Sequence, residues 1–251
     1  MGWFSQLVDA VTARVTRNRP EVPPPGQFTS LDALVARMRE LETQLPAADG
    51  VRAFNGMYLR VTELVRDQLH VGAFRNPAFM TRLDLVFAGL YLEAVARPEQ
   101  AKAWAPLFES RSLGGRVPIQ FALAGMNAHI NHDLPVAVVR TCRQLGLHPA
   151  SPGVEADFQR VTGLLASVQE QVRRSFLDGL ALEVDQTYAA PLANLVGTWS
   201  IGRARAAAWV NAKVLWELHG VEPLQGEFLA TLSRSVGMAG RYLLTPVAQI
   251  A

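Results

Sequence analysis

The chain has 251 residues, of which 49% are hydrophobic and 18% are charged, so it is long enough to bury a substantial core. Its 24 lysine and arginine residues nearly balance 22 aspartate and glutamate residues, and the basic residues are scattered. A nucleic-acid-binding surface needs basic residues clustered on one face. This composition argues against a nucleic-acid partner and favours a protein that folds as one large domain.

Cys142 is the single cysteine, which excludes an internal disulfide and fits a reducing compartment. Its apolar neighbours in AVVRTCRQLG predict a buried position on a helix and not a nucleophile. No uninterrupted apolar window approaches about 18 residues, and the N-terminus lacks the order of a secretory signal. We therefore expect a cytoplasmic protein without stable membrane insertion.

The first predicted element is an amphipathic helix over residues 3–16, where apolar side chains recur at helical spacing. The proline-rich connector RNRPEVPPPGQF follows, and it cannot continue a helix because proline lacks the backbone donor and restricts the residue before it. Residues 1–26 are thus expected to form a semi-detached unit ahead of a helical-bundle domain at residues 27–251. The first helix either packs on that domain or binds a membrane surface or partner transiently.

Capping patterns predict the first helices of the main domain. One helix should begin at Ser30 and run to Leu45, and the next should follow Asp49. Asn76-Pro77 supplies an N-cap and a first-turn proline for a third helix. Pro98 should then open a short helix that contains Trp104.

The segment IQFALAGMNAHI, from Ile119, is apolar on all sides and predicts a helix surrounded by others. Pro135 disfavours helical geometry at Leu134, so we expect a break or kink there before VAVVRTCRQLG resumes. Further helices are predicted at residues 154–177, 192–218 and 226–244, and no set of alternating strands is evident. The predicted fold class is all-α, a single large bundle of roughly nine or ten helices.

The motif GMNAHINHDLP carries the most concentrated polar chemistry of the chain. On a helix, His129, His132 and Asp133 share a face, because residues three and four apart are neighbours. Two imidazoles and a carboxylate are a donor set for a divalent transition metal, with an open position for catalysis. Facing carboxylates from other helices would complete such a site, and the candidates are Asp84, Glu63 and Asp185.

Asp84 lies within the apolar run LDLVFAGLYLEA. A carboxylate there is expected to be buried and so to need a partner, a metal or a raised pKa. Asp84 is therefore a predicted site residue in its own right.

A structural interpretation of the same motif stays open. Asp133 is placed to cap the next helix, Asn127 and Asn131 can bond across buried helices, and His132 suits a helix end. His-x-x-His-Asp also lacks the glutamate of the His-Glu-x-x-His motif and the Glu-x-x-His pairs of di-iron bundles. A polar site without a metal is thus favoured over a metal site.

A second cluster lies in TWSIGRARAAAWVNAKVLWEL. Trp209 and Trp216 share a face with Lys213 and roughly with Arg205. One interpretation is a core helix, and the other is an aromatic-walled pocket in which Arg203 or Arg205 binds a carboxylate or phosphate. Such a pocket would gain polar groups from elsewhere in the chain, and the predicted ligand-binding residues are Arg205, Asn55, Tyr58, Asn127 and Trp209.

Several classes of chemistry find no motif in the chain. It contains no Gly-rich phosphate loop, nucleophile elbow or Cys-x-x-Cys pair, so no nucleotide cofactor, serine-hydrolase activity or thiol redox activity is expected.

The succession FNGMYLRVTE, LDLVFAGLYLEA, QFALAGMNAHINHDLP and TWSIGRARAAAW resembles a family of bacterial, largely actinobacterial, helical proteins catalogued as a domain of unknown function. The resemblance covers roughly residues 45–245. It implies that the main body is one domain and that five residues belong to one recurring arrangement: Asp84, His129, His132, Asp133 and Arg205. It implies no established activity.

The leading hypothesis is an enzyme that acts on a small apolar molecule inside the bundle. His129 or His132 would be the general acid or base, Asp133 or Asp84 would orient it, and Arg205 would hold an anionic end. Isomerisation, cyclisation or elimination fits this set without a cofactor, and a metal-assisted reaction is its variant. The alternatives are a non-catalytic small-molecule carrier and a partner-binding module that uses the first helix; a homo-oligomer is compatible with all three.

Overall fold

The structure, a computed structural model, describes residues 28–166, 197 and 199–249. That part of the chain is built of helices and contains no strand, which confirms the prediction of an all-α fold. The predicted N-terminal helix and its connector, the second half of the helix predicted at 154–177, and Asp185 lie outside the described residues.

The first three helices begin where their capping residues predicted. Ser30, Asp49 and Asn76 each accept a hydrogen bond from a backbone N–H in the first turn. These side chains satisfy donors that a helix N-terminus otherwise leaves unpaired. The helices are α2 (Leu31–Gln44), α3 (Gly50–His70) and α4 (Pro77–Ala96).

The prediction of one short helix after Pro98 was wrong. The chain forms a single 3₁₀ turn, η1 (Pro98–Gln100), and then a separate short helix, α5 (Ala105–Ser110). Pro106 lies in the first turn of α5, which is the helical position that proline tolerates, so a helix cannot run through it from Pro98. Trp104 is the residue that precedes α5, and its indole is buried.

The middle of the chain forms one continuous rod. It consists of α6 (Pro118–Ala128), a π-helical turn η2 (His129–Asp133) and α7 (Leu134–Leu145). We predicted a break or kink at Leu134; instead the backbone N–H of Leu134 donates to the carbonyl of His129, five residues back. The wider turn accommodates Pro135, which has no N–H and would crowd the carbonyl four residues before it in a regular α-helix.

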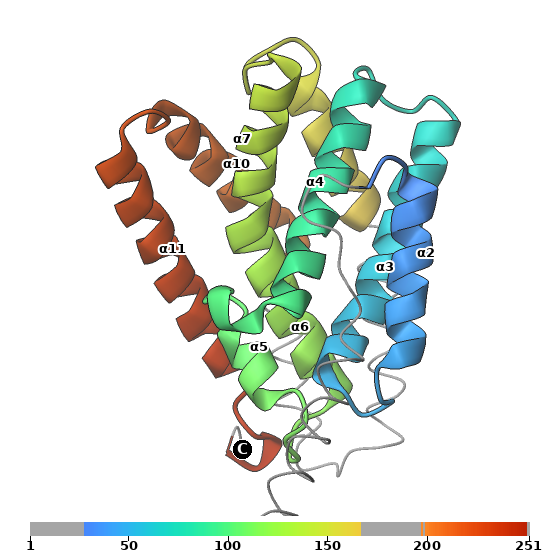
Figure 1. The fold of residues 1–251 in the computed structure, drawn as a ribbon, viewed down its shortest axis with the longest axis vertical. Helices are drawn as coiled ribbons and strands as arrows, with labels where there is room; N and C mark the ends of the chain where they lie inside the picture. The colour runs from blue at the N-terminus through green and yellow to red at the C-terminus, as the bar shows by residue number, and fades with distance from the viewer. Residues whose placement is uncertain (1–27, 167–196, 198, 250–251) are drawn as a thin grey trace, which may run out of the picture.

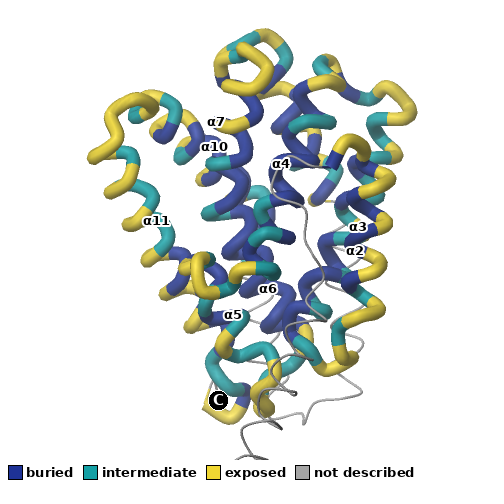
Figure 2. The backbone as a smooth tube through the Cα atoms, in the orientation of Figure 1, coloured by how far each residue is buried: buried dark blue, intermediate teal, exposed yellow. Residues whose placement is uncertain are grey.

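The rod occupies the centre of the bundle, as its apolar sequence predicted. Helices α3 and α11 pack along α6, while α4 and α10 pack along α7 (Figure 1). Every residue of α6 from Ile119 to Ala128 is buried, and the tube is dark blue along this helix (Figure 2). The rod therefore presents the π-helical turn to the interior of the protein.

The last helices are α10 (Ile201–Glu217) and α11 (Glu222–Leu243), followed by the turn η3 (Val247–Gln249). The helix predicted at 192–218 is not continuous, because α10 begins at Ile201 after Ser200, which is extended and caps the helix with its hydroxyl. Residues 192–196 and 198 of that prediction lie outside the described residues. The helix predicted from residue 226 begins earlier, with Pro223 in its first turn. Residues 154–166 are helical, in agreement with the predicted start at Val154.

Two further expectations concern the whole chain. Cys142 is fully buried and forms no disulfide, and burial raises the pKa of its thiol to about 11. Among the described helices, none has both the length and the apolar character needed to span a bilayer.

We expect Gly125→Ala to destabilise the protein. Gly125 lies in α6, where an added Cβ would overlap the ring of buried Phe54. Because the surrounding core is closely packed, the substitution should lower the free energy of unfolding by about 1–3 kcal/mol. Urea denaturation measures the change.

Gly226→Ala is the matched control. Gly226 lies within α11, where an added Cβ meets nothing within 4 Å, so the better helix propensity of alanine should raise stability by about 0.5–1 kcal/mol. Equal effects of the two substitutions would contradict the close approach of α3 and α6.

Candidate functional site

The π-helical turn places His129 among aromatic side chains of α3 and α4. Its imidazole stacks on Phe87 with 3.6 Å between ring centroids and 2° between ring planes. The ring of Tyr58 meets it edge-on at 4.5 Å. His129 is only 2% exposed, so these contacts fix the orientation of a buried imidazole.

Asp133 holds both imidazoles of the motif. One carboxylate oxygen lies 3.0 Å from Nδ1 of His129 and accepts the indole N–H of Trp104 at 2.9 Å. The other oxygen lies 2.8 Å from Nδ1 of His132. Burial by itself raises the pKa of Asp133, but the hydrogen bonds of the two histidines outweigh it and lower the pKa to about 2. An ionised carboxylate only accepts hydrogen bonds, so each imidazole carries a proton on Nδ1.

His129 is therefore a neutral base. Burial lowers its pKa more than the hydrogen bond to Asp133 raises it, and the neutral ring places its single proton on Nδ1. Nε2 is then left with a free lone pair. This nitrogen is buried and has no hydrogen-bond partner among the described residues.

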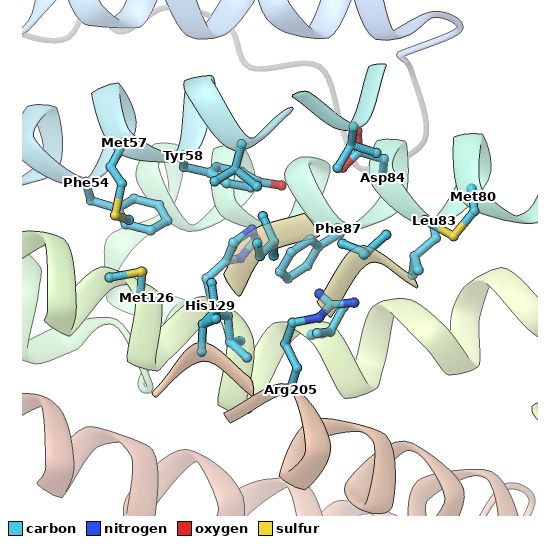
Figure 3. Close-up of a pocket in the computed structure, with 17 residues that line it drawn as sticks. Phe54, Met57, Tyr58, Met80, Leu83, Asp84, Phe87, Met126, His129 and Arg205 are labelled. Atoms are coloured by element: carbon cyan, nitrogen blue, oxygen red, sulfur yellow. The ribbon is translucent and has the colours of Figure 1, made fainter. Parts of the chain in front are cut away.

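A cavity of about 60 Å³ adjoins the ring of His129. That volume is enough for several water molecules or for part of a small ligand. Figure 3 shows the cavity and the side chains that converge on it from several helices. Its apolar lining consists of Phe54, Met57, Val61, Val65, Met80, Leu83, Phe87, Met126, Ile130, Leu134, Val161, Leu165 and Ile201.

Two further polar groups of the cavity lack partners. The hydroxyl of Tyr58 and one carboxylate oxygen of Asp84 are buried and make no hydrogen bond within the part of the chain that the structure describes. The hydroxyl of Thr62, one turn along α3, donates to the backbone carbonyl of Tyr58 and not to its ring hydroxyl. Burial, and then the charge of Asp84, raises the pKa of Tyr58 well above 10, so the phenol stays protonated and can donate.

Asp84 and Arg205 face the same cavity without forming an ion pair. Burial raises the pKa of Asp84 to about 7, although the charge of Arg205 opposes the shift. Burial likewise lowers the pKa of Arg205 to about 9, against the attraction of Asp84. Asp84 therefore changes protonation near neutral pH, while Arg205 stays a cation.

The guanidinium of Arg205 is positioned by the neighbouring helix at residues 154–166. Its Nε donates to Thr162 Oγ1 and its Nη2 to the carbonyl of Phe158, each at 3.0 Å. The group also lies 4.2 Å over the ring of Phe158. Nη1 makes no hydrogen bond to any described residue. In Figure 3 the side chain reaches from α10 toward Phe87, with Tyr58 and Asp84 on the opposite side.

The structure thus brings together four of the predicted site residues around one cavity, namely His129, Asp84, Arg205 and Tyr58. Asp133 supports His129 from behind, and it does not cap α7, because its oxygens are engaged by the three side-chain donors. His132 lies on the other side of Asp133 and lines a different cavity.

Three predicted ligand-binding residues do not line the central cavity. Asn55 donates to the carbonyl of Met38 and to Glu42, and Asn127 donates to the carbonyl of Val236. Trp209 packs against Phe158. These side chains lie on other faces of their helices and serve contacts between helices; the bond from Asn127 to α11 is the cross-helix role that the structural interpretation predicted.

The metal interpretation finds no support in the geometry. Among the described residues, no group of three or more histidine, cysteine, aspartate or glutamate side chains could hold a metal ion. His129, His132 and Asp133 do meet, but the histidines bond to the carboxylate and do not surround a common point. Glu63 instead pairs with Arg39 at the surface, at 2.6 Å.

Sequence reasoning missed two contributors to this site. Trp104 donates to Asp133 from a part of the chain 29 residues away; the only hint is that a buried indole N–H normally needs an acceptor. Phe87, which stacks on His129, lies three residues after Asp84. This spacing puts both side chains on one face of a helix, and it is the signal that could have identified Phe87.

Residues 31–246 match a family model described as "Family of unknown function (DUF5995)". The chain belongs to this family. The match confirms the expected resemblance to a domain of unknown function and extends it to include α2. Neither the curated proteins nor the solved structures provide a match to the chain. The family assignment therefore supplies no activity, and the chemistry of this DUF5995 chain has to be argued from its own site.

We expect Asp84→Asn to stabilise the protein in a pH-dependent way. An aspartate titrates near 3.8 when unfolded, whereas Asp84 titrates at about 7 in the folded protein. Between these values the unfolded state binds fewer protons than the folded state, so stability falls as pH rises from about 4 to about 7, and the penalty stays complete above pH 7. The shift corresponds to a loss on the order of 4 kcal/mol.

Urea denaturation of both proteins between pH 4 and pH 8 measures this effect. The stability of Asp84→Asn relative to the natural protein should increase with pH over the interval and then level off, while other titrating groups cancel in the difference. A difference that is independent of pH would show that Asp84 does not have a raised pKa.

The tautomer of His129 provides a second test. Long-range ¹H–¹⁵N correlation spectra at pH 7 should show a neutral ring with its proton on Nδ1 and an unprotonated Nε2, and protonation should occur below pH 6.5 because burial lowers the pKa. A cationic ring at pH 7, or a proton on Nε2, would contradict the role assigned to Asp133.

Proposed function

We propose that this chain is an enzyme that binds a small, largely apolar molecule in the central cavity and moves a proton with His129 as general base. The observation that carries the proposal is a neutral, oriented imidazole that lines an apolar cavity and whose Nε2 has no hydrogen-bond partner among the described residues. An isomerase, cyclase or lyase reaction fits best, because each needs proton transfer and none requires a cofactor.

The unsatisfied groups support a ligand at this position. A buried polar atom without a hydrogen bond costs about 1–3 kcal/mol, and three such atoms border one cavity: His129 Nε2, the Tyr58 hydroxyl and one oxygen of Asp84. His129 Nε2 is an acceptor, the Tyr58 hydroxyl is a donor, and the Asp84 oxygen accepts when the carboxyl is ionised and can donate when it is protonated. A bound molecule with complementary polar atoms would satisfy all three.

The residues also divide the roles that proton transfer requires. His129 accepts a proton at Nε2, and the ionised Asp133 stabilises the imidazolium that forms. Asp84, with a pKa of about 7, is protonated often enough at neutral pH to return a proton as general acid. Arg205 binds an anionic end of the molecule through its unoccupied Nη1.

Non-catalytic binding in the same cavity is the second candidate. The predominantly apolar lining favours it, since a carrier needs burial of the ligand and only a few polar groups to orient it. Turnover distinguishes the two functions.

The experiment uses deuterium exchange. The full-length chain is incubated in D₂O with pools of small apolar carbonyl compounds, and mass spectrometry measures deuterium gain or conversion of each. A general base contributes roughly 10²–10⁴-fold, so His129→Gln should slow exchange by at least about 100-fold. His70→Gln, at the exposed end of α3, is the matched control and should leave the rate unchanged.

Native mass spectrometry of the same mixtures resolves the alternative. A compound retained by the protein but neither exchanged nor converted would identify a carrier. Exchange that is equally fast in His129→Gln would refute the role of this imidazole.

A further inference from the structure

A second cavity lies on the other side of Asp133 from the first. Its volume is about 270 Å³, and it is bordered by the end of α4, the turn η1, the segment before α5, the π-helical turn and α11. His132, Asp133 and Ser233 all line it. None of these residues lines the central cavity.

Ser233, His132 and Asp133 form a connected chain of hydrogen bonds in this cavity. Ser233 Oγ lies 2.9 Å from Nε2 of His132, and Nδ1 of the same ring lies 2.8 Å from Asp133. Because the ionised carboxylate can only accept, His132 donates from Nδ1 and its Nε2 accepts the serine hydroxyl proton. The order hydroxyl, imidazole, carboxylate is that of an activated serine nucleophile.

We propose that Ser233 is a nucleophile, activated by His132 and Asp133, that reacts with the carbonyl carbon of an ester bound in this second cavity. The site goes beyond the proton transfer assigned to His129 and does not depend on it. It would give the chain a hydrolytic activity that uses a different pair of side chains around the same carboxylate, contrary to the expectation drawn from the lack of a nucleophile elbow in the sequence.

The surroundings support a nucleophile over a purely structural hydrogen bond. The Asp133 side chain is 7% exposed, whereas that of His132 is 23% exposed and Ser233 is half-buried. The serine thus reaches the cavity while the carboxylate stays dry. Trp104 anchors Asp133 from behind at 2.9 Å, which limits the motion of the whole array.

Two side chains that border the same cavity have the chemistry to stabilise the negative charge that develops on an ester oxygen. Gln100 and Lys102 line it, and neither side chain forms a hydrogen bond or ion pair with any described residue. An amide N–H and an ammonium group can both stabilise an oxyanion.

The reaction balances with water as the only co-reactant. Ser233 Oγ forms a bond to the acyl carbon as its proton passes to His132 Nε2; the bond to the leaving alcohol then breaks, and the imidazolium returns the proton to that alkoxide. Water, deprotonated by His132, next attacks the acyl-serine. The carboxylic acid leaves, and Ser233 regains its proton.

The test uses a fluorophosphonate probe on the full-length chain. Ser233 should attack phosphorus and release fluoride, which adds one phosphonyl group detectable by intact-mass and peptide mass spectrometry. Ser233→Ala should abolish the label. Ser235→Ala, an exposed serine two residues away on the same helix, should label like the natural protein.

His132→Gln adds a readout that a structural serine would not move. Loss of the general base should slow labelling of Ser233, and any hydrolysis of p-nitrophenyl acetate, by at least about 100-fold. A natural chain that stays unlabelled at Ser233 under excess probe overturns the proposal, as does labelling that persists in Ser233→Ala. Either result leaves deuterium exchange at His129 unaffected, so the two proposed sites fail or succeed separately.

Discussion

The centre of this protein depends on one buried carboxylate that accepts hydrogen bonds from three side chains. A buried charge costs several kcal/mol unless it is fully paired, and Asp133 achieves this with His129, His132 and Trp104. These contacts connect the central rod to the segment before α5. Removing the carboxylate would leave an indole N–H and two imidazoles without an acceptor, so the same interaction supports the fold and fixes the protonation of both histidines.

The π-helical turn places the two histidines that contact Asp133 in different surroundings. His129 is stacked among aromatic rings and faces an apolar cavity, whereas His132 is partly exposed and contacts a serine of α11. Because Asp133 is acceptor-only, it imposes the same tautomer on both rings, with the proton on Nδ1 and an accepting Nε2, and each ring lines its own cavity. Pro135 lies in the first turn of α7, directly after this π-helical turn.

The sequence predicted the helices well where the physical cause was local. Ser30, Asp49 and Asn76 cap helices through their own side chains, and the apolar rod from Ile119 had to be buried. Asp84 stood out because a carboxylate in an apolar run needs a partner or a raised pKa, and Arg205 because it roughly shares a helical face with two tryptophans; both line the cavity beside His129. The predictions that failed concerned contacts between helices. Asn55 and Asn127 bind the backbone of neighbouring helices. The contact of His132 with Ser233 joins residues 101 positions apart, so no pattern in the sequence indicated it. Periodicity fixes which side chains share a face, but not which face of another helix they meet.

Asp84 and Arg205 both line the central cavity but do not pair with each other. Their separation indicates which kind of molecule would bind there. The two groups attract each other across the cavity, yet burial shifts the pKa of each toward its neutral form, and no ion pair forms. A closed ion pair would be more favourable than two separated buried charges, so this separation is a cost to the stability of the fold. A molecule that binds both groups would recover it, and binding would then stabilise the folded state as well as orient the ligand. The polarity of that molecule follows from the same pair: an anionic or accepting end toward Arg205, and an apolar body against the methionine, leucine and phenylalanine side chains that surround it.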